Sequence, residues 1–249
     1  MNISLTIAYD GTSYLGWQMT NAGSSIEETL RTAIEKILQE PIFLQAASRT
    51  DAGVHAEGQV VNFITTKEYL KIDKLQRSIN AVLPPTIVIH NIAIMPNNFH
   101  PTLDATGKEY HYNICYGPIQ FPRHRYFSWH FPYDLDIVVM TEAAQLFIGE
   151  KDFSALRNRK KNENQRNSIR EISKIAIIPL SNSRLRIEVE GASFLYKMVR
   201  NIVGTIAYVG SGKLSLADVR QIIASRNRTI AGITAPAHGL TLLRVKTGA

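Results

Sequence analysis

The sequence has almost no cysteine and no long apolar run. Cys115 is the only cysteine in 249 residues, which excludes an intrachain disulfide and leaves too few ligands for a cysteine-based zinc site. No apolar run is long enough to span a bilayer, and the opening residues M-N-I-S-L-T-I-A-Y-D carry no basic leader before an apolar core. These absences predict no membrane association and favour a reducing, cytoplasmic compartment.

Acidic residues are also scarce relative to basic ones. Lys and Arg number 28 and Asp and Glu number 21, which gives a net charge of +7. A basic surplus of this size fits a polyanionic partner such as nucleic acid, but it also fits a mildly basic soluble enzyme. The hydrophobic content of 45% is enough to bury one large core or two modest ones.

Hydrophobic periodicity predicts a mixture of strands and helices in a similar order in each half of the chain. The predicted strands cover residues 3–9, 42–47, 59–64, 87–95, 106–116, 169–178, 185–189 and 240–245. The predicted helices cover residues 25–39, 72–82, 135–147, 194–208 and 216–224. Because tight βαβ alternation is missing, we expect an α+β fold of two similar subdomains, 1–104 and 105–249, whose mostly antiparallel sheets join.

The stretch A-A-S-R-T-D-A-G-V-H-A places Asp51 two residues after Arg49 and two before Gly53. Asp before a glycine is common in turns, so a purely structural Asx-turn is one interpretation. The other is chemical, since the neighbouring guanidinium would keep Asp51 ionised, and an ionised Asp can act as a nucleophile. An aspartic protease needs a second such motif, and the sequence has none.

His55, in the same stretch, could serve as a general base, but a lone histidine after such a loop more often makes structural hydrogen bonds. It lacks the H-x-x-H and H-E-x-x-H patterns of metal sites, so we expect no metal here.

Two later stretches carry further candidates. In G-K-E-Y-H-Y-N-I-C-Y, strand alternation puts Tyr110 on an aromatic face, where one tyrosine at the strand end could stack on a nucleobase. In F-L-Y-K-M-V-R-N-I-V-G, the apolar stripe of a helix leaves Lys197, Arg200 and Asn201 on another face. Arg200 is then either solvated or paired with a carboxylate, for which Asp51 is one candidate.

Two basic segments are candidate RNA contacts. The connector 117–132 mixes basic and aromatic residues in F-P-R-H-R-Y-F, and residues 157–170 hold six basic residues against one Glu. The second segment lacks apolar periodicity, which predicts a mobile loop that is either a solvated surface or an arm that orders on RNA phosphates. The candidates are Arg123, Arg125, Arg157, Arg159, Lys160, Lys161 and Arg166.

Six stretches together resemble the TruA family of tRNA pseudouridine synthases, in family order from end to end of the chain. They are Y-D-G-T-S-Y-L-G-W-Q, S-R-T-D-A-G-V-H-A, N-F-H-P-T-L-D-A-T-G-K-E-Y-H-Y, D-F-S-A-L, F-L-Y-K-M-V-R-N-I-V-G-T and A-P-A-H-G-L-T-L. The R-T-D-A-G-V-H-A and M-V-R-N-I-V-G stretches are the specific ones.

The resemblance implies the pseudouridine synthase fold with a central catalytic cleft, in a homodimer that acts on the anticodon arm of tRNA. It implies isomerisation of uridine to pseudouridine at tRNA positions 38, 39 and 40, without a small-molecule cofactor or metal. Asp51 matches the family's nucleophile, and Arg49 matches the arginine that helps the base leave the stack. Tyr110 matches the tyrosine on the uracil, Arg200 the arginine paired with the carboxylate, and Leu240 a leucine of the pocket.

Some positions depart from the family pattern. Ser48 stands where glycine is common, Thr102 and Lys151 replace an arginine and a histidine, and the usual final tyrosine is absent from R-V-K-T-G-A. Thr102 puts one RNA contact in doubt. Two other classes remain open, a tRNA-binding module without catalysis and a hydrolase that uses Asp51. The intact set of Asp51, Arg49, Tyr110 and Arg200 argues against the first, and the missing second acidic motif argues against the other.

Overall fold

The computed structural model describes residues 1–158 and 167–248. The chain divides into two compact units, one of Met1–Thr106 with Thr241–Ala249 and one of Gly107–Leu240. The last strand of the chain thus belongs to the first unit, whereas subdomains of 1–104 and 105–249 would group it with the C-terminal half. The division of the chain into subdomains 1–104 and 105–249 stays a prediction.

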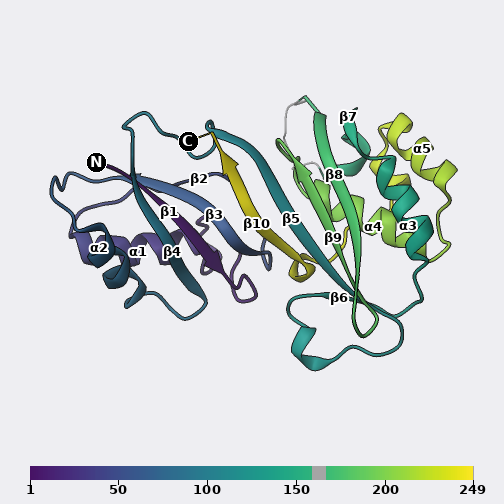
Figure 1. Cartoon of the computed structure of the whole chain (residues 1–249), viewed down its shortest axis with the longest axis horizontal. Helices are drawn as coiled ribbons and strands as arrows, with labels where there is room; N and C mark the ends of the chain where they lie inside the picture. Colours follow the sequence, from purple (N-terminus) through teal and green to yellow (C-terminus); the bar gives the residue numbers. More distant parts are fainter. Residues whose placement is uncertain (159–166, 249) are drawn as a thin grey trace. The chain divides into compact units, whose positions relative to one another are not determined.

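The first unit is a sheet with helices, and its strands run in the order β4-β1-β3-β10 (Figure 1). Its strands are β1 (Asn2–Tyr9), β2 (Gln45–Ala46), β3 (His55–Ile64), β4 (Ile87–Met95) and β10 (Leu240–Thr247). β1 pairs antiparallel with both β3 and β4, β2 pairs antiparallel with β3, and β10 pairs in parallel with β3. The strand β3 therefore lies inside the sheet, directly after the candidate loop.

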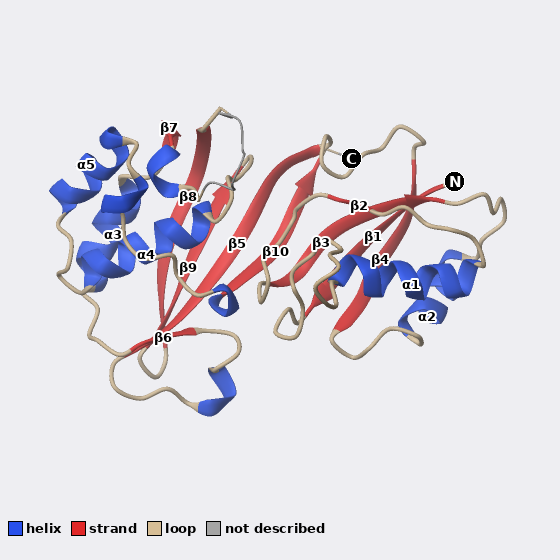
Figure 2. Cartoon of the chain, turned by 180° about the vertical axis from the view of Figure 1, so that it is seen from behind, coloured by secondary structure: helices blue, strands red, loops and turns tan. Residues whose placement is uncertain are grey.

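Helices α1 (Ile26–Leu38) and α2 (Ile72–Asn80) belong to this unit, and α2 packs against α1 and β4 (Figure 2). α1 begins where expected, because the Ser25 hydroxyl accepts a hydrogen bond from the Glu28 backbone N–H at 3.2 Å. Its apolar residues are buried, among them Leu30 and Ile34, together with Ile3, Leu5 and Ile7 of β1. The apolar residues that recur with the helical period of 3.6 and the strand period of 2 thus form the core of this unit.

β3 is buried on both of its faces, which the alternation expected for a half-buried strand does not explain. A second small core of Ala47, Val60 and Phe99 forms beside the main one. Asn2 is buried and donates through its side-chain amide to the backbone oxygens of Pro96 and Phe99. The segment after β4 is therefore fastened to the sheet by hydrogen bonds.

The second unit has a sheet in the order β5-β9-β8-β7, with neighbouring strands antiparallel (Figure 1). Its strands are β5 (Ala105–Tyr116, from Gly107 onward), β6 (Trp129–Phe131), β7 (Gly149–Asp152), β8 (Ile169–Leu180) and β9 (Arg184–Gly191). Short β6 pairs with β5 in parallel. Its helices are α3 (Ile137–Gln145), α4 (Met198–Gly210) and α5 (Leu216–Ser225). α3 packs on α4, α5 and β8 (Figure 2).

Four short 3-10 helices complete the described elements: η1 (Pro122–His124), η2 (Ser154–Leu156), η3 (Arg228–Ile230) and η4 (Ala237–Gly239). The α+β class and the mostly antiparallel pairing within each unit confirm the expectation from periodicity.

Several predicted boundaries are wrong. The strand expected over 42–47 contains only β2, because Ile42 is buried and its N–H donates to the Glu35 carboxylate of α1 at 3.0 Å. β3 begins at His55, four residues before its predicted start. The helix expected from residue 194 begins at Met198, since Lys197 has left-handed backbone with φ 59°. β7 was not expected, because G-E-K-D carries no apolar residue.

Candidate active site

Asp51 lies in the loop between β2 and β3 of the first unit, half-buried, with Arg49 exposed two residues earlier. The Val54 N–H donates to the Asp51 carbonyl at 3.1 Å, and Gly53 has φ 77°. This is a tight turn that needs glycine at its third position. The turn chemistry read from D-A-G is therefore present, and it sets the direction in which the chain leaves Asp51.

A second loop, residues 10–17, braces this turn through its backbone. The Trp17 N–H donates to the Thr50 carbonyl at 3.0 Å, and the Gly53 N–H donates to the Tyr14 carbonyl at 3.3 Å. A Cβ on Gly16 would lie 2.6 Å from the Thr50 oxygen and 2.9 Å from the Asp51 carbonyl carbon. The two backbones touch on both sides of Asp51, so its position is fixed by a partner loop and not by one turn alone.

Gln59 of β3 holds the entrance of the loop. Its side chain is fully buried, accepts from the Ser48 N–H at 3.2 Å and donates to the Ser48 carbonyl at 2.6 Å. Since both bonds involve the backbone of Ser48, the family's glycine is not needed for them. Sequence reasoning missed Gln59, whose only signal was a polar residue at the start of an apolar strand.

His55 makes hydrogen-bond contacts of the structural kind, and a role as a general base stays untested. It is buried, its Nδ1 accepts from the Gly11 N–H at 3.1 Å, and the Asp10 carboxylate lies 3.2 Å from the same nitrogen. The imidazole thus joins the bracing loop to the first residue of β3.

Thr102, at a departure from the family pattern, has a defined structural contact. Its hydroxyl donates to the Ala46 carbonyl at 2.8 Å, which joins the segment after β4 to β2. The residue is therefore part of the scaffold below the loop.

The second unit carries Tyr110 and Arg200. Tyr110 is buried on β5, and its ring meets that of Phe194 edge to face with centroids 5.2 Å apart. Arg200 is half-buried on the first turn of α4, where its Nε donates to the Ala235 carbonyl at 2.7 Å. Its own carbonyl accepts from the Ala235 N–H at 3.1 Å. One residue therefore holds Arg200 by both its backbone and its side chain.

Burial raises the pKa of Tyr112 well above its usual value, while the nearby Arg200 charge opposes that rise. The Tyr112 hydroxyl donates to the Pro236 carbonyl at 2.8 Å, and a Cβ on Gly239 would lie 2.5 Å from the Tyr112 ring. The buried Leu240 follows directly. Residues 235–240 thus run from Arg200 to Tyr112 and set the position of Leu240.

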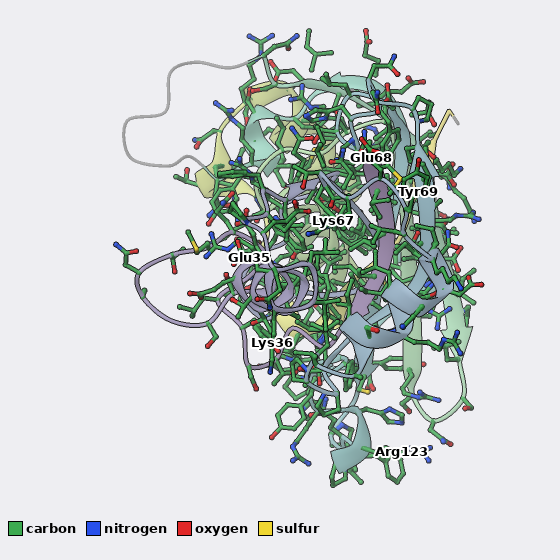
Figure 3. The ribbon with its side chains drawn as sticks, turned by 90° about the vertical axis from the view of Figure 1, so that its left-hand side faces the viewer. Glu35, Lys36, Lys67, Glu68, Tyr69 and Arg123 are labelled. Carbon is green, nitrogen blue, oxygen red and sulfur yellow. The ribbon has the colours of Figure 1, made fainter. Side chains whose placement is uncertain are left out.

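Arg123 and Arg125 are exposed on the loop between β5 and β6, which includes η1; Figure 3 shows Arg123 at the surface of the chain. The Arg125 guanidinium lies 4.2 Å from the centre of the Tyr126 ring. Both arginines thus lie at the surface.

Arg157 differs from the surface residue that was expected. It is 5% exposed, and its Nε has no hydrogen-bond partner among the described residues. Residues 169 and 170 belong to β8, so the expected loop is shorter than 157–170. Arg159, Lys160, Lys161 and Arg166 lie outside the described residues.

The grouping of Lys197, Arg200 and Asn201 on one polar face is wrong for Asn201, which is fully buried in α4. Its amide makes contacts that periodicity could not reveal, because asparagine in a helix is read as a surface residue. Periodicity could not reveal the contacts of Arg228 either, whose guanidinium donates a hydrogen bond to the Asn201 side chain.

Among the described residues, Glu109, His111 and Glu188 form a group that could hold a metal ion, with one ligand atom of each within 4.8 Å of the others. His111 lies 3.3 Å from Glu109 and 3.7 Å from Glu188, and Lys174 lies 3.0 Å from Glu188. These contacts join the three side chains to one another and to Lys174. His111 also alternates with Tyr110 along β5 and so points to the opposite face.

No helix in the described part of the chain is long and apolar enough to cross a membrane. The loop between β2 and β3 thus carries a half-buried carboxylate, Asp51, two residues after an exposed arginine, Arg49, and a second loop holds its backbone.

Comparison with known proteins identifies the enzyme class. A family model described as tRNA pseudouridine synthase matches residues 5–103 and 143–247. The chain is 52% identical to tRNA pseudouridine synthase A 2 of Protochlamydia amoebophila, over 98% of this chain and 93% of that one. It is 40% identical to tRNA pseudouridine synthase A of Thermoanaerobacter sp., over 98% of each. The chain belongs to the tRNA pseudouridine synthases, a family of RNA-modifying isomerases, as its motifs predicted.

Proposed function

We propose that this chain converts uridine to pseudouridine at positions 38, 39 and 40 in the anticodon stem-loop of tRNAs, with Asp51 as the nucleophile. The observation that carries the proposal is the braced loop, because a second loop holds the backbone that bears Asp51 in place before the substrate arrives. A preorganised group does not spend binding energy on its own ordering.

The target base must first leave the stack, which costs a few kcal/mol. Arg49 is exposed beside Asp51 and would offset part of this cost by filling the gap or binding a phosphate. Tyr110, whose ring packs at right angles to that of Phe194, would pack on the uracil, with Leu240 at the pocket wall. Arg200 would pair with the catalytic carboxylate.

The reaction is an isomerisation and needs no external reactant. In one route, an Asp51 oxygen bonds to ribose C1′ as the C1′–N1 bond breaks, and the electron pair stays on uracil N1. The base turns, C5 attacks C1′ and releases the carboxylate, and the C5 proton is lost while N1 gains one. Attack at uracil C6, or removal of a ribose proton to give a glycal, uses the same carboxylate.

We also propose that the enzyme works as a homodimer in the cytoplasm. Arg123, Arg125 and the basic residues of 157–170 would contact RNA phosphates. The net charge of +7 supports a polyanionic substrate. Arg157 is buried, so it is less accessible to RNA than the exposed Arg123 and Arg125.

The test mixes purified protein with an unmodified tRNA transcript that has uridines at positions 38 to 40, and maps pseudouridine by carbodiimide-dependent primer extension. Wild type should give stops at these positions, and Asp51→Asn should lower the rate by roughly 10³-fold or more. Asp73→Asn, an exposed carboxylate on α2 of the same unit, is the matched control and should keep full activity.

Each other outcome has a definite meaning. Stops elsewhere in the tRNA would keep the reaction and reject the anticodon assignment. Binding of tRNA without any stops would favour a binding module. Equal stops from wild type and Asp51→Asn would reject Asp51 as the nucleophile.

A further inference from the structure

The side-chain amide of Asn201 is the centre of a buried polar network in the second unit. Its Nδ2 donates at 2.9 Å to the Leu156 carbonyl and at 2.9 Å to the Asn158 side chain. Its Oδ1 accepts from the Arg228 guanidinium at 2.9 Å and from the Thr234 hydroxyl at 2.7 Å. Two donor hydrogens and two acceptor sites are thus all used, which an amide with no exposed surface requires.

Arg228, on η3, bridges this amide to the segment that follows it. One terminal nitrogen donates to the Gly232 carbonyl at 2.9 Å, and the other donates to Asn201 Oδ1 and to the Thr234 hydroxyl at 2.8 Å. A planar guanidinium reaches these acceptors in one orientation only. The geometry therefore holds residues 232–234 against α4.

Close packing allows this segment little freedom. A Cβ on Gly204 of α4 would lie 1.7 Å from the Ile233 carbonyl oxygen, and the Gly232 N–H donates to the Thr205 hydroxyl at 3.1 Å. The backbone of residues 232–233 thus lies directly against α4, at a distance that only a glycine at position 204 permits.

Ala235, the next residue, makes two hydrogen bonds with Arg200. Its carbonyl accepts from Arg200 Nε at 2.7 Å and its N–H donates to the Arg200 carbonyl at 3.1 Å. An arginine held through Nε has the plane of its guanidinium fixed, and so the direction of its two terminal nitrogens. The orientation of Arg200 thus depends on where Ala235 lies, and Ala235 follows the residues that Arg228 and Asn201 hold.

We propose that Arg228, acting through Asn201 and Thr234, is a positioning residue that sets the orientation of the Arg200 guanidinium for catalysis. The proposal rests on the proposed function, in which Arg200 pairs with the catalytic carboxylate. Arg228 touches neither substrate nor reacting atoms in this account. A displacement of about 1 Å in a catalytic group can cost roughly 10²-fold in rate, so a distant anchor can govern kcat.

The test compares Arg228→Gln and Thr234→Val with wild type in single-turnover pseudouridine formation on the same tRNA transcript. The rate at saturating enzyme should fall by roughly 10- to 100-fold. The tRNA Kd, measured separately by filter binding, should change by less than about twofold, because a positioning residue makes no RNA contact. Arg228→Lys should stay slow, since its ammonium keeps the charge but loses the planar fork.

Arg226→Gln is the matched control, because it removes the same charge two residues earlier from an exposed side chain that pairs with Asp152 at 3.0 Å. It should keep the wild-type rate. Melting curves of every variant separate folding from catalysis, since rates are referred to folded protein.

The decisive comparison is the double variant Arg228→Gln with Arg200→Lys. If Arg228 acts through Arg200, the double variant should be no more than about twofold slower than Arg200→Lys alone. A rate equal to the product of the two single effects would overturn the inference, as would a lower melting temperature with a normal rate per folded molecule. Failure of the proposed function would look different, because wild type would then be inactive or Asp51→Asn fully active.

Discussion

Tyr112 shows at the scale of one residue how β5 is joined to the segment that carries Leu240. Its ring is fully buried, and its hydroxyl donates to the Pro236 carbonyl. Because burial disfavours the phenolate, the pKa of Tyr112 is well above that of an exposed tyrosine. The stability of this unit should therefore depend on pH in the alkaline range, where Tyr112 can ionise.

Tyr112→Phe should lower the melting temperature at pH 7 by a few degrees, since a net hydrogen bond contributes about 1 kcal/mol. The raised pKa of Tyr112 also predicts the direction in which this stabilisation changes with pH. The contribution of Tyr112 to stability is fully present below the pKa of about 10 that a tyrosine has in the unfolded chain, and it is lost as pH rises from there through the raised pKa of the folded state. The difference in melting temperature between wild type and variant should therefore shrink above pH 10. A constant difference from pH 7 to 10.5 would contradict this account.

Single residues were predictable where a short motif carried them. Asp51, Arg49, Tyr110, Arg200 and Leu240 were all chosen from local sequence, though their roles stay predictions. Gln59, Asn201 and Arg228 could not be chosen in this way, because their partners lie far along the chain and polar residues are normally read as surface. A buried polar network depends on the fold and has no local pattern.

At the scale of elements, the two loops around Asp51 act as one piece. Gly16 has φ 93° and lies against the backbone of residues 50–52. This close approach makes loop 10–17 part of the site although none of its residues was a catalytic candidate.

Gly16→Ala should lower the rate of pseudouridine formation more than its effect on stability explains. Positive φ costs an alanine about 1 kcal/mol, and here the new Cβ would also push the backbone at Asp51. Gly212→Ala is the control, because Gly212 also has positive φ, at 73°, but no atom within 4 Å of the added Cβ. Gly16→Ala should lose more stability than Gly212→Ala because of the backbone clash, and only Gly16→Ala should be slow per folded molecule. Equal rates per folded molecule would argue that the brace has no catalytic role.

Element prediction succeeded where periodicity was strong and failed where another force decided. α1 and β4 were placed within a residue of their observed bounds. β7 has no apolar residue and exists because it pairs with β8, and β2 does not extend back to Ile42, whose N–H bonds to Glu35 of α1. Such pairing decisions are made by tertiary structure, which overrides local preference.

For the molecule as a whole, the net charge of +7 predicts tRNA binding that weakens steeply with salt. The basic segment 157–170 should supply several of the phosphate contacts. Lys160→Gln with Lys161→Gln should therefore lower the slope of log K against log salt concentration by about 1.4 to 1.8, or 0.7 to 0.9 for each phosphate that is no longer neutralised.

The control for this charge change is Lys36→Gln with Lys67→Gln. Both lysines are exposed on the first unit, on α1 and on the loop after β3, and are labelled in Figure 3. The control should leave the slope unchanged. Equal slopes in the two double variants would show that tRNA binding follows net charge alone and that the basic segment makes no phosphate contacts of its own.

The return of β10 to the first unit has a consequence for biosynthesis. Thr241 and Leu242 pair with His55 and Ala56, the residues that directly follow the candidate loop. Translation proceeds from the N-terminus, so β3 lacks this neighbour until almost the whole chain has left the ribosome. The edge of β3 is exposed during that interval and can pair wrongly. We therefore expect the nascent chain to need protection longest at the strand that follows the candidate loop, and closure of the first unit to be a late step of folding.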